Sequence, residues 1–158
     1  MSSPQPPTTP KPRGGSGRPP GTLRIGSIAG VDVLVRSSWL ILAVLIAVIM
    51  APAVDSVRPG LGALKYLAGM AFAVLLYFSV LLHEVSHAVM ARRFGIEVES
   101  IQLDFLGGVT QITSPARTAG QEFSIAIVGP LTSILVGFLA LLGAMVTPDG
   151  LLLLTMQG

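Results

Sequence analysis

Two histidines four residues apart, His83 and His87, are the residues best suited to chemistry in this chain of 158 residues, which contains no other histidine. Residues with this spacing lie on one face of a helix, about 6 Å apart, so their imidazole nitrogens can bind one zinc ion together. Glu84 follows the first histidine and projects around the same side of a helix. A carboxylate in that position can serve as a general base towards a water molecule at the metal without being a ligand itself.

The composition is that of a membrane protein, because 51% of the residues are hydrophobic and only 11% are charged, against about 25% charged in an ordinary soluble protein. The chain contains no cysteine, which excludes disulfides and thiolate zinc sites and leaves His, Asp, Glu or backbone oxygen as metal ligands. The net charge of +2 is small and the basic residues are spread through loops, so nucleic-acid binding is not supported.

The apolar surroundings of the motif decide between two interpretations of Glu84. In a soluble helix, the histidines and the glutamate could simply satisfy one another or the neighbouring backbone. Within a membrane-spanning segment, an unpaired carboxylate costs about 2.5–3.5 kcal/mol or more, so a functional role becomes the default. The membrane context therefore favours a functional role for Glu84 and the two histidines.

Long apolar runs separated by polar connections predict a mainly α, polytopic membrane protein. The predicted helices are three spanning segments and the start of a fourth, at about residues 38–54, 64–91, 122–146 and from 151. Gly129 and Pro130 are expected to interrupt the third helix. Residues 1–21, rich in proline, glycine and basic residues, predict a disordered tail, because they cannot bury enough apolar surface to fold. Residues 22–158 then form the N-terminal part of a membrane-embedded core.

Shorter segments with alternating apolar and polar residues predict small membrane-associated β-hairpins or a sheet. Residues 23–35, whose apolar parts are separated by Gly26 and Gly30, predict a short hairpin at the membrane surface. A second β region covers about residues 95–113. Its alternation slips at Ser100, which predicts a bulge.

Positive charge in the loops predicts how the chain is oriented in the cell membrane. Five lysines and arginines precede the first helix, two lie in or beside the first connection, and three lie between the second and third helices. Because short cytoplasmic loops carry the excess of positive charge, the N-terminus and the second loop should be cytoplasmic. His83 lies about 27 Å along its helix from Lys65, at roughly 1.5 Å per residue. The motif should therefore lie just inside the cytoplasmic face.

The motif and the segments after it resemble the site-2 protease family of intramembrane zinc metalloproteases, peptidase family M50. The resemblance covers about Arg24 to Val146 and points to the prokaryotic branch, whose members often carry a pair of cystathionine-β-synthase (CBS) domains after the membrane core. It rests on four segments in this order: Leu82-His83-Glu84-Val85-Ser86-His87-Ala88, Leu106-Gly107-Gly108-Val109, Gln121-Glu122-Phe123 and Gly129-Pro130-Leu131-Thr132-Ser133.

By this resemblance, His83 and His87 would bind one zinc ion, Zn²⁺, and Glu84 would be the catalytic acid/base. The family takes its third zinc ligand from an Asp in a Leu-Asp-Gly sequence on the next membrane helix, and no such sequence occurs here. Asp104 lies in strand context and Asp149 in a turn on the opposite side, so neither is a good substitute. The chain therefore resembles an N-terminal fragment whose third ligand is expected from an Asp beyond residue 158.

The resemblance also implies roles for two glycine-containing segments. The strand region Gly107–Val109 would present an extended substrate to the metal, whereas the sequence alone favours an ordinary hairpin turn there. Gly129, Pro130 and Ser133 would lie on the helix opposite the active site, and the family often has Asn at the position of Ser133. A packing notch with a kink is the simpler role for Gly129 and Pro130.

The function expected of the full-length protein is that of a zinc-dependent intramembrane endopeptidase acting in the lipid bilayer. Its substrate would be a single-pass transmembrane protein, unwound near the cytoplasmic face and held extended by strand addition to residues 96–113. A metal-ion transporter is the main alternative, but the first and third helices offer almost no Asp, Glu, His or Asn in their interiors. A non-catalytic membrane scaffold that retains the motif is the third alternative.

Overall fold

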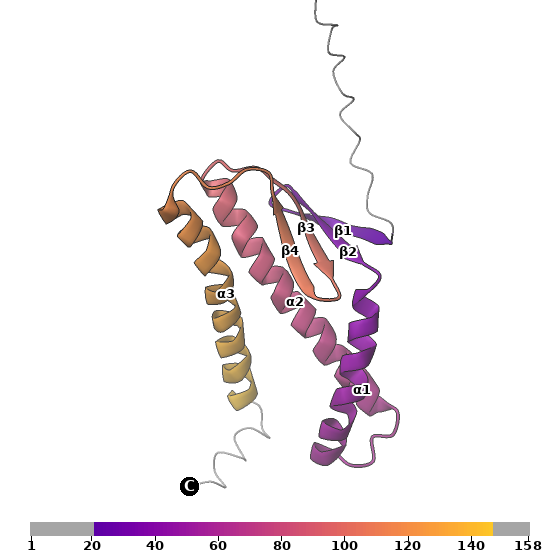
Figure 1. Ribbon diagram of the computed structural model, residues 1–158. Helices are drawn as coiled ribbons and strands as arrows, with labels where there is room; N and C mark the ends of the chain where they lie inside the picture. The colour runs from indigo at the N-terminus through magenta and orange to yellow at the C-terminus, as the bar shows by residue number, and fades with distance from the viewer. Residues whose placement is uncertain (1–20, 147–158) are drawn as a thin grey trace, which may run out of the picture.

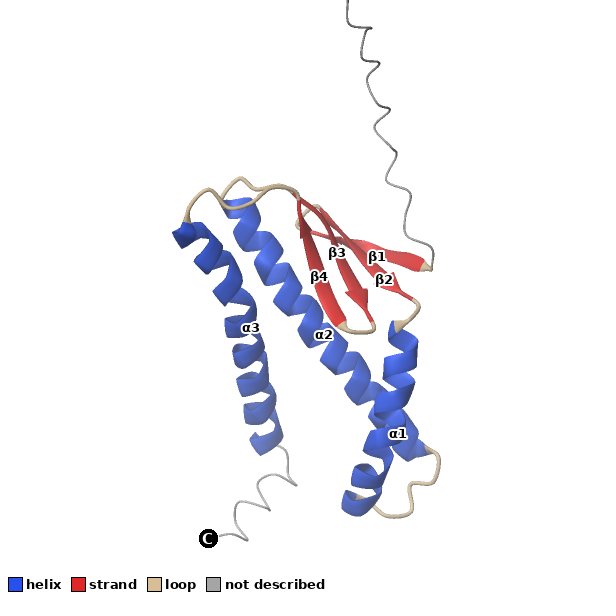
Figure 2. Cartoon of the chain, viewed as in Figure 1, coloured by secondary structure: helices blue, strands red, loops and turns tan. Residues whose placement is uncertain are grey.

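Three long helices and one four-stranded sheet make up the computed structural model, which describes residues 21–146 (Figures 1 and 2). The strands are β1 (Thr22–Ile28), β2 (Val31–Arg36), β3 (Val98–Asp104) and β4 (Gly107–Ile112). The helices are α1 (Trp39–Val57), α2 (Leu64–Arg93) and α3 (Ala119–Val146). The predicted tail, apart from its last residue, and the predicted fourth helix lie outside the described residues.

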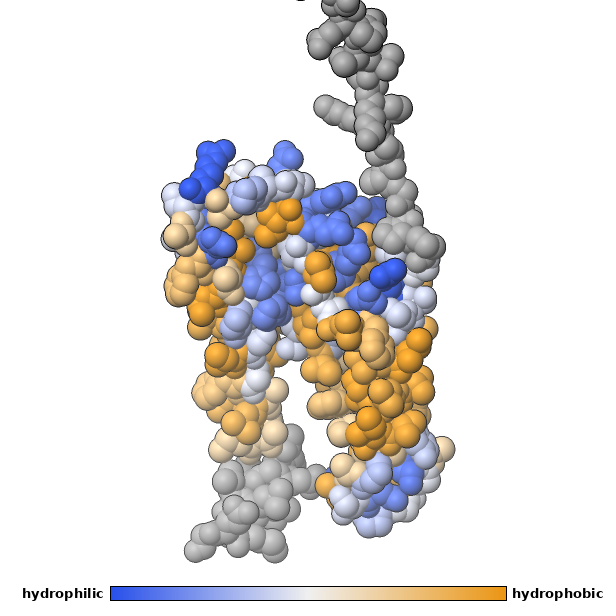
Figure 3. All heavy atoms as spheres, viewed as in Figure 1, coloured by the Kyte–Doolittle hydropathy of each residue, from blue (hydrophilic) through white to orange (hydrophobic). Residues whose placement is uncertain are grey.

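Each of the three helices is long and apolar enough to cross a membrane. α2 lies at the centre and contacts α1, α3 and two strands of the sheet, and Figure 1 shows α1 and α3 on opposite sides of it. Figure 3 shows apolar surface over the helices, between polar surface at the sheet end and at the α1–α2 connection. The prediction of a mainly helical chain with three helices of spanning length is therefore confirmed.

The ends of the helices differ from the predicted ones by a few residues. α1 ends three residues later than expected, at Val57, and α3 begins three residues earlier, at Ala119. α3 also continues through Gly129 and Pro130 as one helix, so the expected interruption was wrong. A proline removes one backbone N–H, and spanning helices tolerate this loss because neighbouring helices and hydroxyl side chains can satisfy the freed carbonyl groups.

Small residues let α1 and α2 approach each other closely. A Cβ atom added to Gly69 would lie 2.7 Å from Ala47 Cα, so this glycine makes room for the backbone of α1. Ala43, Ala51 and Ala73 are also buried. Because lipid tails are as apolar as leucine, close packing of small residues is what holds such helices together. This contact anchors α2, the helix that carries the histidine motif.

The two predicted β regions join into one sheet, in the order β1-β2-β3-β4. β1 pairs with β2 and β3 pairs with β4 in antiparallel hairpins, whereas β2 and β3 run parallel. The connection between the two parallel strands consists of α1 and α2. A register shift between Val98 and Ser100 confirms the predicted bulge. β1 and β4 are the edge strands, and β4 contacts α2.

The inner face of the sheet packs on the C-terminal half of α2. The centre of this contact is a cluster of Val31, Ala88 and Ile101, with Val85 packed against it. Because side chains alternate along a strand, this packing determines which residues of β4 face the helix. The sheet thereby holds β4 beside the turn of α2 that carries Glu84.

The end of β3 is tied to the start of α1 by the carboxylate of Asp104. It accepts hydrogen bonds from the Ser38 hydroxyl, from the Phe105 amide at 2.6 Å and from the Arg36 guanidinium at 2.9 Å. These bonds, above all the one from Ser38, lower the pKa of Asp104 from 3.8 to about 2. The Tyr77 hydroxyl of α2 donates to the backbone carbonyl of Asp104 at 3.3 Å. The sheet, α1 and α2 therefore meet at one polar junction.

Candidate metal centre

The two histidines lie on the C-terminal half of α2, on the face that meets α3. The ring centroids of His83 and His87 are 4.7 Å apart, and the ring planes meet at 76°. Both residues are half-buried, and each makes a hydrogen bond to a residue of α3. The spacing of four residues therefore brings both imidazoles to one interface between helices.

The Nδ1 atoms of both histidines are occupied by partners from α3. His87 Nδ1 lies 2.6 Å from the backbone carbonyl oxygen of Ile125, and His83 Nδ1 lies 2.8 Å from the Ser133 hydroxyl. Because a carbonyl oxygen only accepts hydrogen bonds, His87 carries a proton on Nδ1, so Nε2 is the ring nitrogen available to a metal ion. Metal-binding histidines are typically held in this way, with the second ring nitrogen fixed by a hydrogen bond.

The Nε2 atoms of both rings converge on Gly129, where α3 has no side chain. A Cβ atom built on this glycine would lie 2.6 Å from His83 Nε2 and closer still to His87 Nε2. The two rings fill the place of the missing side chain, so both Nε2 atoms lie within 2.6 Å of one point. Because zinc–nitrogen bonds are about 2.0–2.1 Å long, two imidazole nitrogens this close together can share one ion. The pair of donors thus fits a metal ion.

Glu84 lies on the neighbouring face of α2, against β4. It is only 9% exposed, and its Oε2 atom accepts a hydrogen bond of 2.7 Å from the Thr110 hydroxyl. A Cβ atom on Gly108 would lie 3.0 Å from Glu84 Oε1, so the backbone of β4 lies directly against the carboxylate. Burying a carboxylate is costly unless its charge has partners. A buried glutamate beside two imidazoles is therefore typical of a functional site.

His83 and His87 are the two candidate metal ligands that residues 21–146 bring together. They contain no group of three or more His, Cys, Asp or Glu residues placed to hold a metal ion together. Asp104 is bound within the polar junction between β3 and α1, and Asp149 lies outside the described residues.

The glycine pair follows the turn of the β3–β4 hairpin instead of forming it. Asp104 pairs with Gly107 across a two-residue turn of Phe105 and Leu106. Gly107 has a φ of +129°, a backbone conformation that essentially only glycine adopts. The next residue, Gly108, pairs with Leu103. The alternative in which the glycines are themselves the turn is therefore wrong.

The outer edge of β4 has no strand beside it among the described residues. Val109 on this strand is 59% exposed, and Leu106 in the preceding turn is 93% exposed. Figure 2 shows the β3–β4 turn extending alongside the middle of α2. Unpaired backbone groups at that depth need water or another chain as a partner, because lipid offers none.

Two residues of this site were not singled out by the sequence. Thr110 lies two residues after Gly108, so strand alternation does place both on the face towards α2, and this was the available signal. Ile125 contributes a backbone carbonyl, which leaves no trace in a pattern of side chains. Ser133, expected on the helix opposite the site, does lie beside His83, whereas Pro130 is exposed.

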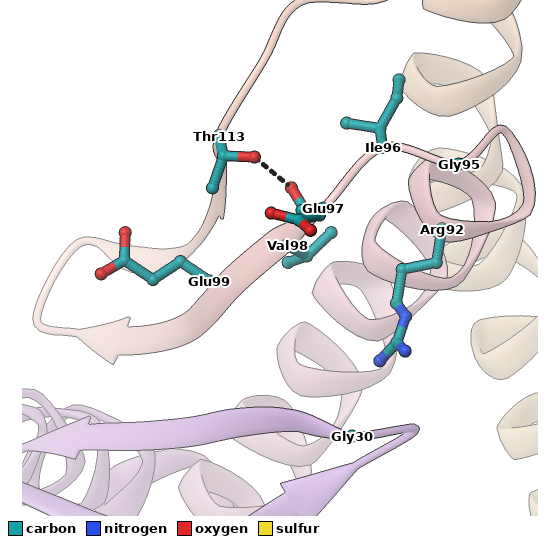
Figure 4. Close-up of a pocket in the computed structure, with 8 residues that line it drawn as sticks. All are labelled: Gly30, Arg92, Gly95, Ile96, Glu97, Val98, Glu99 and Thr113. Carbon is teal, nitrogen blue, oxygen red and sulfur yellow. Dashed lines mark hydrogen bonds between the residues drawn. The ribbon is translucent and has the colours of Figure 1, made fainter.

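A separate polar hollow of about 470 Å³ lies at the end of the sheet away from the β3–β4 turn (Figure 4). Arg92 points towards the turn at Gly30 and donates to the carbonyl oxygen of Ala29. Glu97 and Glu99 also line the hollow and are exposed. Neither histidine of the motif lines it, so it is distinct from the candidate metal centre.

Comparisons with known proteins agree on one family. The model of Peptidase family M50 matches residues 71–152. The chain is 41% identical over 111 residues to the protein named Putative zinc metalloprotease Rip3 from Mycobacterium tuberculosis, and 34% identical over 119 residues to Putative zinc metalloprotease sll0528 from Synechocystis. These matches cover 70% and 75% of this chain but 28% and 31% of the two relatives. The chain therefore spans less than a third of their length.

A solved structure, that of the Site-2 Protease from Methanocaldococcus jannaschii, has a similar fold. It superposes with a TM-score of 0.55 at 22% sequence identity, covering 80% of this chain and 52% of that chain. At this identity the likeness concerns the arrangement of helices and strands. The arrangement of three helices around a small sheet is thus one that a solved protein also has.

Proposed function

The chain belongs to peptidase family M50, the site-2 protease family, and from this premise we propose that it carries the metal-binding part of a zinc-dependent intramembrane endopeptidase. The relatives bear the name zinc metalloprotease, which supports a hydrolase with a zinc cofactor. The observation that carries the proposal is the convergence of both Nε2 atoms on Gly129, on the same helix as the buried Glu84 that follows His83 in the sequence.

We assign one zinc ion to His83 and His87, with a third protein ligand from an Asp beyond residue 158. Such an ion supplies Lewis acidity, which polarises a carbonyl group and activates a water molecule. Ser133 and the carbonyl oxygen of Ile125 hold the imidazoles at Nδ1, so neither ring turns away from its partner. Gly129 leaves room for both rings, which lie where the side chain of a larger residue would be.

Glu84 is the acid/base in this proposal. Its carboxylate takes a proton from the attacking water and later returns it to the departing amine. Because the Thr110 hydroxyl binds Oε2, Oε1 is the oxygen that is left for proton transfer. Oε1 lies over Gly108, where the side chain of a larger residue would obstruct it.

The outer edge of β4 is the proposed docking site for the substrate, with Gly107, Gly108 and Val109 as the contacting residues. An extended segment added to this edge gains backbone hydrogen bonds, and it satisfies strand groups that lipid cannot satisfy. A helical substrate has to unwind first, because its peptide bonds are shielded by their own hydrogen bonds. The substrate class is therefore a single-pass transmembrane protein with a segment that unwinds easily.

We place the site near the cytoplasmic face of the cell membrane. Arg92 and Arg93 end α2 and are exposed, and positive charge at the end of a spanning helix favours the cytoplasmic side. This orientation leaves the N-terminus in the cytoplasm, on the same side as the sheet.

A metal-ion carrier would need ligands on several helices and a polar path between them. The buried residues of α1 are alanines: Ala43, Ala47 and Ala51. α3 meets the histidines with a hydroxyl group and a backbone carbonyl. Among the described residues, no observation therefore favours transport over hydrolysis.

The full-length protein reconstituted in proteoliposomes with a single-pass substrate distinguishes the candidate functions. We expect cleavage that a chelator abolishes and added zinc restores, without uptake of zinc into the vesicles. Zinc uptake without cleavage would establish the carrier instead. A protein that contains no zinc by elemental analysis and cleaves nothing would be the non-catalytic scaffold.

A further inference from the structure

We infer that Thr110 is a positioning residue, which holds the Glu84 carboxylate in the orientation needed for proton transfer. The inference rests on the proposed function, because it concerns the base of that reaction. It adds a second role for β4. The outer edge of this strand is proposed to bind the substrate, and the face of the strand that packs on α2 orients the catalytic carboxylate.

The Thr110 hydroxyl contacts Glu84 at two points. Its Oγ1 lies 2.7 Å from Glu84 Oε2 and 3.2 Å from the backbone carbonyl oxygen of Glu84. A hydroxyl has one proton to donate. The shorter contact is within the range of a charge-assisted bond to a carboxylate, so the proton is directed at Oε2.

Gly108 restrains the same carboxylate from a second position on β4. A Cβ atom on this glycine would lie 2.9 Å from Glu84 Cδ and 3.0 Å from Oε1. Residues two apart on a strand face the same side, so Gly108 and Thr110 present a backbone surface and a hydroxyl group to one side chain. The carboxylate is therefore limited both by contact and by a hydrogen bond.

The strand itself is held by the core of the sheet. Thr110 pairs with Ile101, which is fully buried, and Gly108 pairs with Leu103. A glutamate side chain has several rotamers of similar energy, and burial of its charge without a donor is costly. A donor on a fixed strand selects one of these rotamers before the substrate arrives.

This placement predicts an effect on turnover and not on substrate binding. The Thr110 side chain faces α2, whereas the substrate would pair with the outer edge of β4. In the full-length protein, Thr110→Val keeps the size of the side chain and removes the donor. Because a displaced catalytic group can cost about 100-fold in rate, we expect kcat to fall about 10- to 100-fold, with KM and zinc content unchanged.

Two further variants separate positioning from general damage to the sheet. Thr110→Ser restores the hydroxyl and should recover kcat to within about threefold of wild type, as expected if hydroxyl geometry alone is required. Thr22→Val is the matched control on the far edge strand, β1, because the buried Thr22 hydroxyl has no hydrogen-bond partner among the described residues. It should leave kcat and KM unchanged and should not lower the melting temperature.

The outcomes also separate this inference from the proposed function. The positioning role would be overturned if Thr110→Val kept the kcat of the wild type, or if its kcat fell only together with zinc content or the folded state. In either case, cleavage by the wild type would still support the proposed function.

Discussion

The imidazoles of the candidate metal centre are oriented by uncharged groups on α3. His87 donates Nδ1–H to the Ile125 carbonyl oxygen at 2.6 Å, and His83 Nδ1 lies 2.8 Å from the Ser133 hydroxyl. Such partners fix the tautomer and the direction of each ring. Both hydrogen-bond partners belong to α3, whereas both histidines belong to α2. The orientation of the two rings for metal binding therefore depends on how α2 and α3 pack.

Gly129 is the residue where this packing is tightest. Gly129→Ala would place a methyl group against both Nε2 atoms. Mutations around metal ligands typically lower metal affinity by about 10- to 100-fold, and we expect zinc affinity to fall at least that much. The measurement is zinc content of the full-length protein after dialysis against a graded chelator. Gly137→Ala is the matched control on α3, because a Cβ atom there meets nothing within 4 Å. Full zinc binding by Gly129→Ala would contradict the placement of the ion.

Ser133 gives a second test at this scale. Ser133→Ala removes the partner of His83 Nδ1 without adding bulk, so zinc affinity should fall about 10- to 100-fold. Ser124→Ala on the same helix removes a hydroxyl that bonds only within α3, to the Gly120 carbonyl oxygen. That variant should bind zinc as the wild type does. Equal affinity in all three proteins would show that Ser133 does not orient the ligand.

The elements meet at Asp104, which joins β3 to α1 and α2. Its pKa is lowered from 3.8 to about 2 in the folded protein. A carboxylate with a lowered pKa stabilises the fold above its ordinary pKa, and this stability is lost as the pH falls through the folded value. The junction should therefore weaken on acidification.

Asp104→Asn should lower the melting temperature of the detergent-solubilised protein at pH 7. The difference from wild type should shrink between pH 3.8 and about 2, where Asp104 itself becomes protonated. Asp32→Asn is the control, because Asp32 forms an exposed pair with Arg24 at 2.7 Å, and surface pairs contribute about 0–1 kcal/mol. A difference for Asp104→Asn that stays constant with pH would contradict the role of its charge.

The sequence predicted the elements better than their arrangement. Apolar runs located all three helices, and the phase slip at Ser100 located the bulge, because both signals are local. The parallel pairing of Asp32 with Ser100 could not be predicted, since alternation identifies a strand but not its neighbour. The contact of Thr110 with Glu84 depends on how the sheet packs on α2, which the alternation along β4 does not specify.

At the scale of the whole molecule, the candidate site was predicted in part. His83, Glu84 and His87 follow from residue type and spacing, whereas the hydrogen bonds from α3 require knowledge of how the helices pack. The chain spans less than a third of the length of the curated relatives it matches.

The orientation in the membrane can be measured with single cysteines, because the chain has none of its own. Ser56 lies near the end of α1 and Ser114 follows β4, and both are exposed. In intact cells, a membrane-impermeant maleimide should label Ser56→Cys. It should label Ser114→Cys only after permeabilisation, since cytoplasmic loops carry the positive charge. The reverse pattern would contradict a cytoplasmic site.

The most direct test of the central claim is cleavage of a single-pass substrate by the full-length protein and its Glu84→Gln variant, with zinc content measured on the same samples. Glutamine keeps the shape of the side chain and removes the base. Since a positioned acid/base contributes about 10²- to 10⁴-fold, the variant should retain zinc and lose cleavage by at least that factor. Undiminished cleavage by a zinc-loaded Glu84→Gln protein would contradict the account.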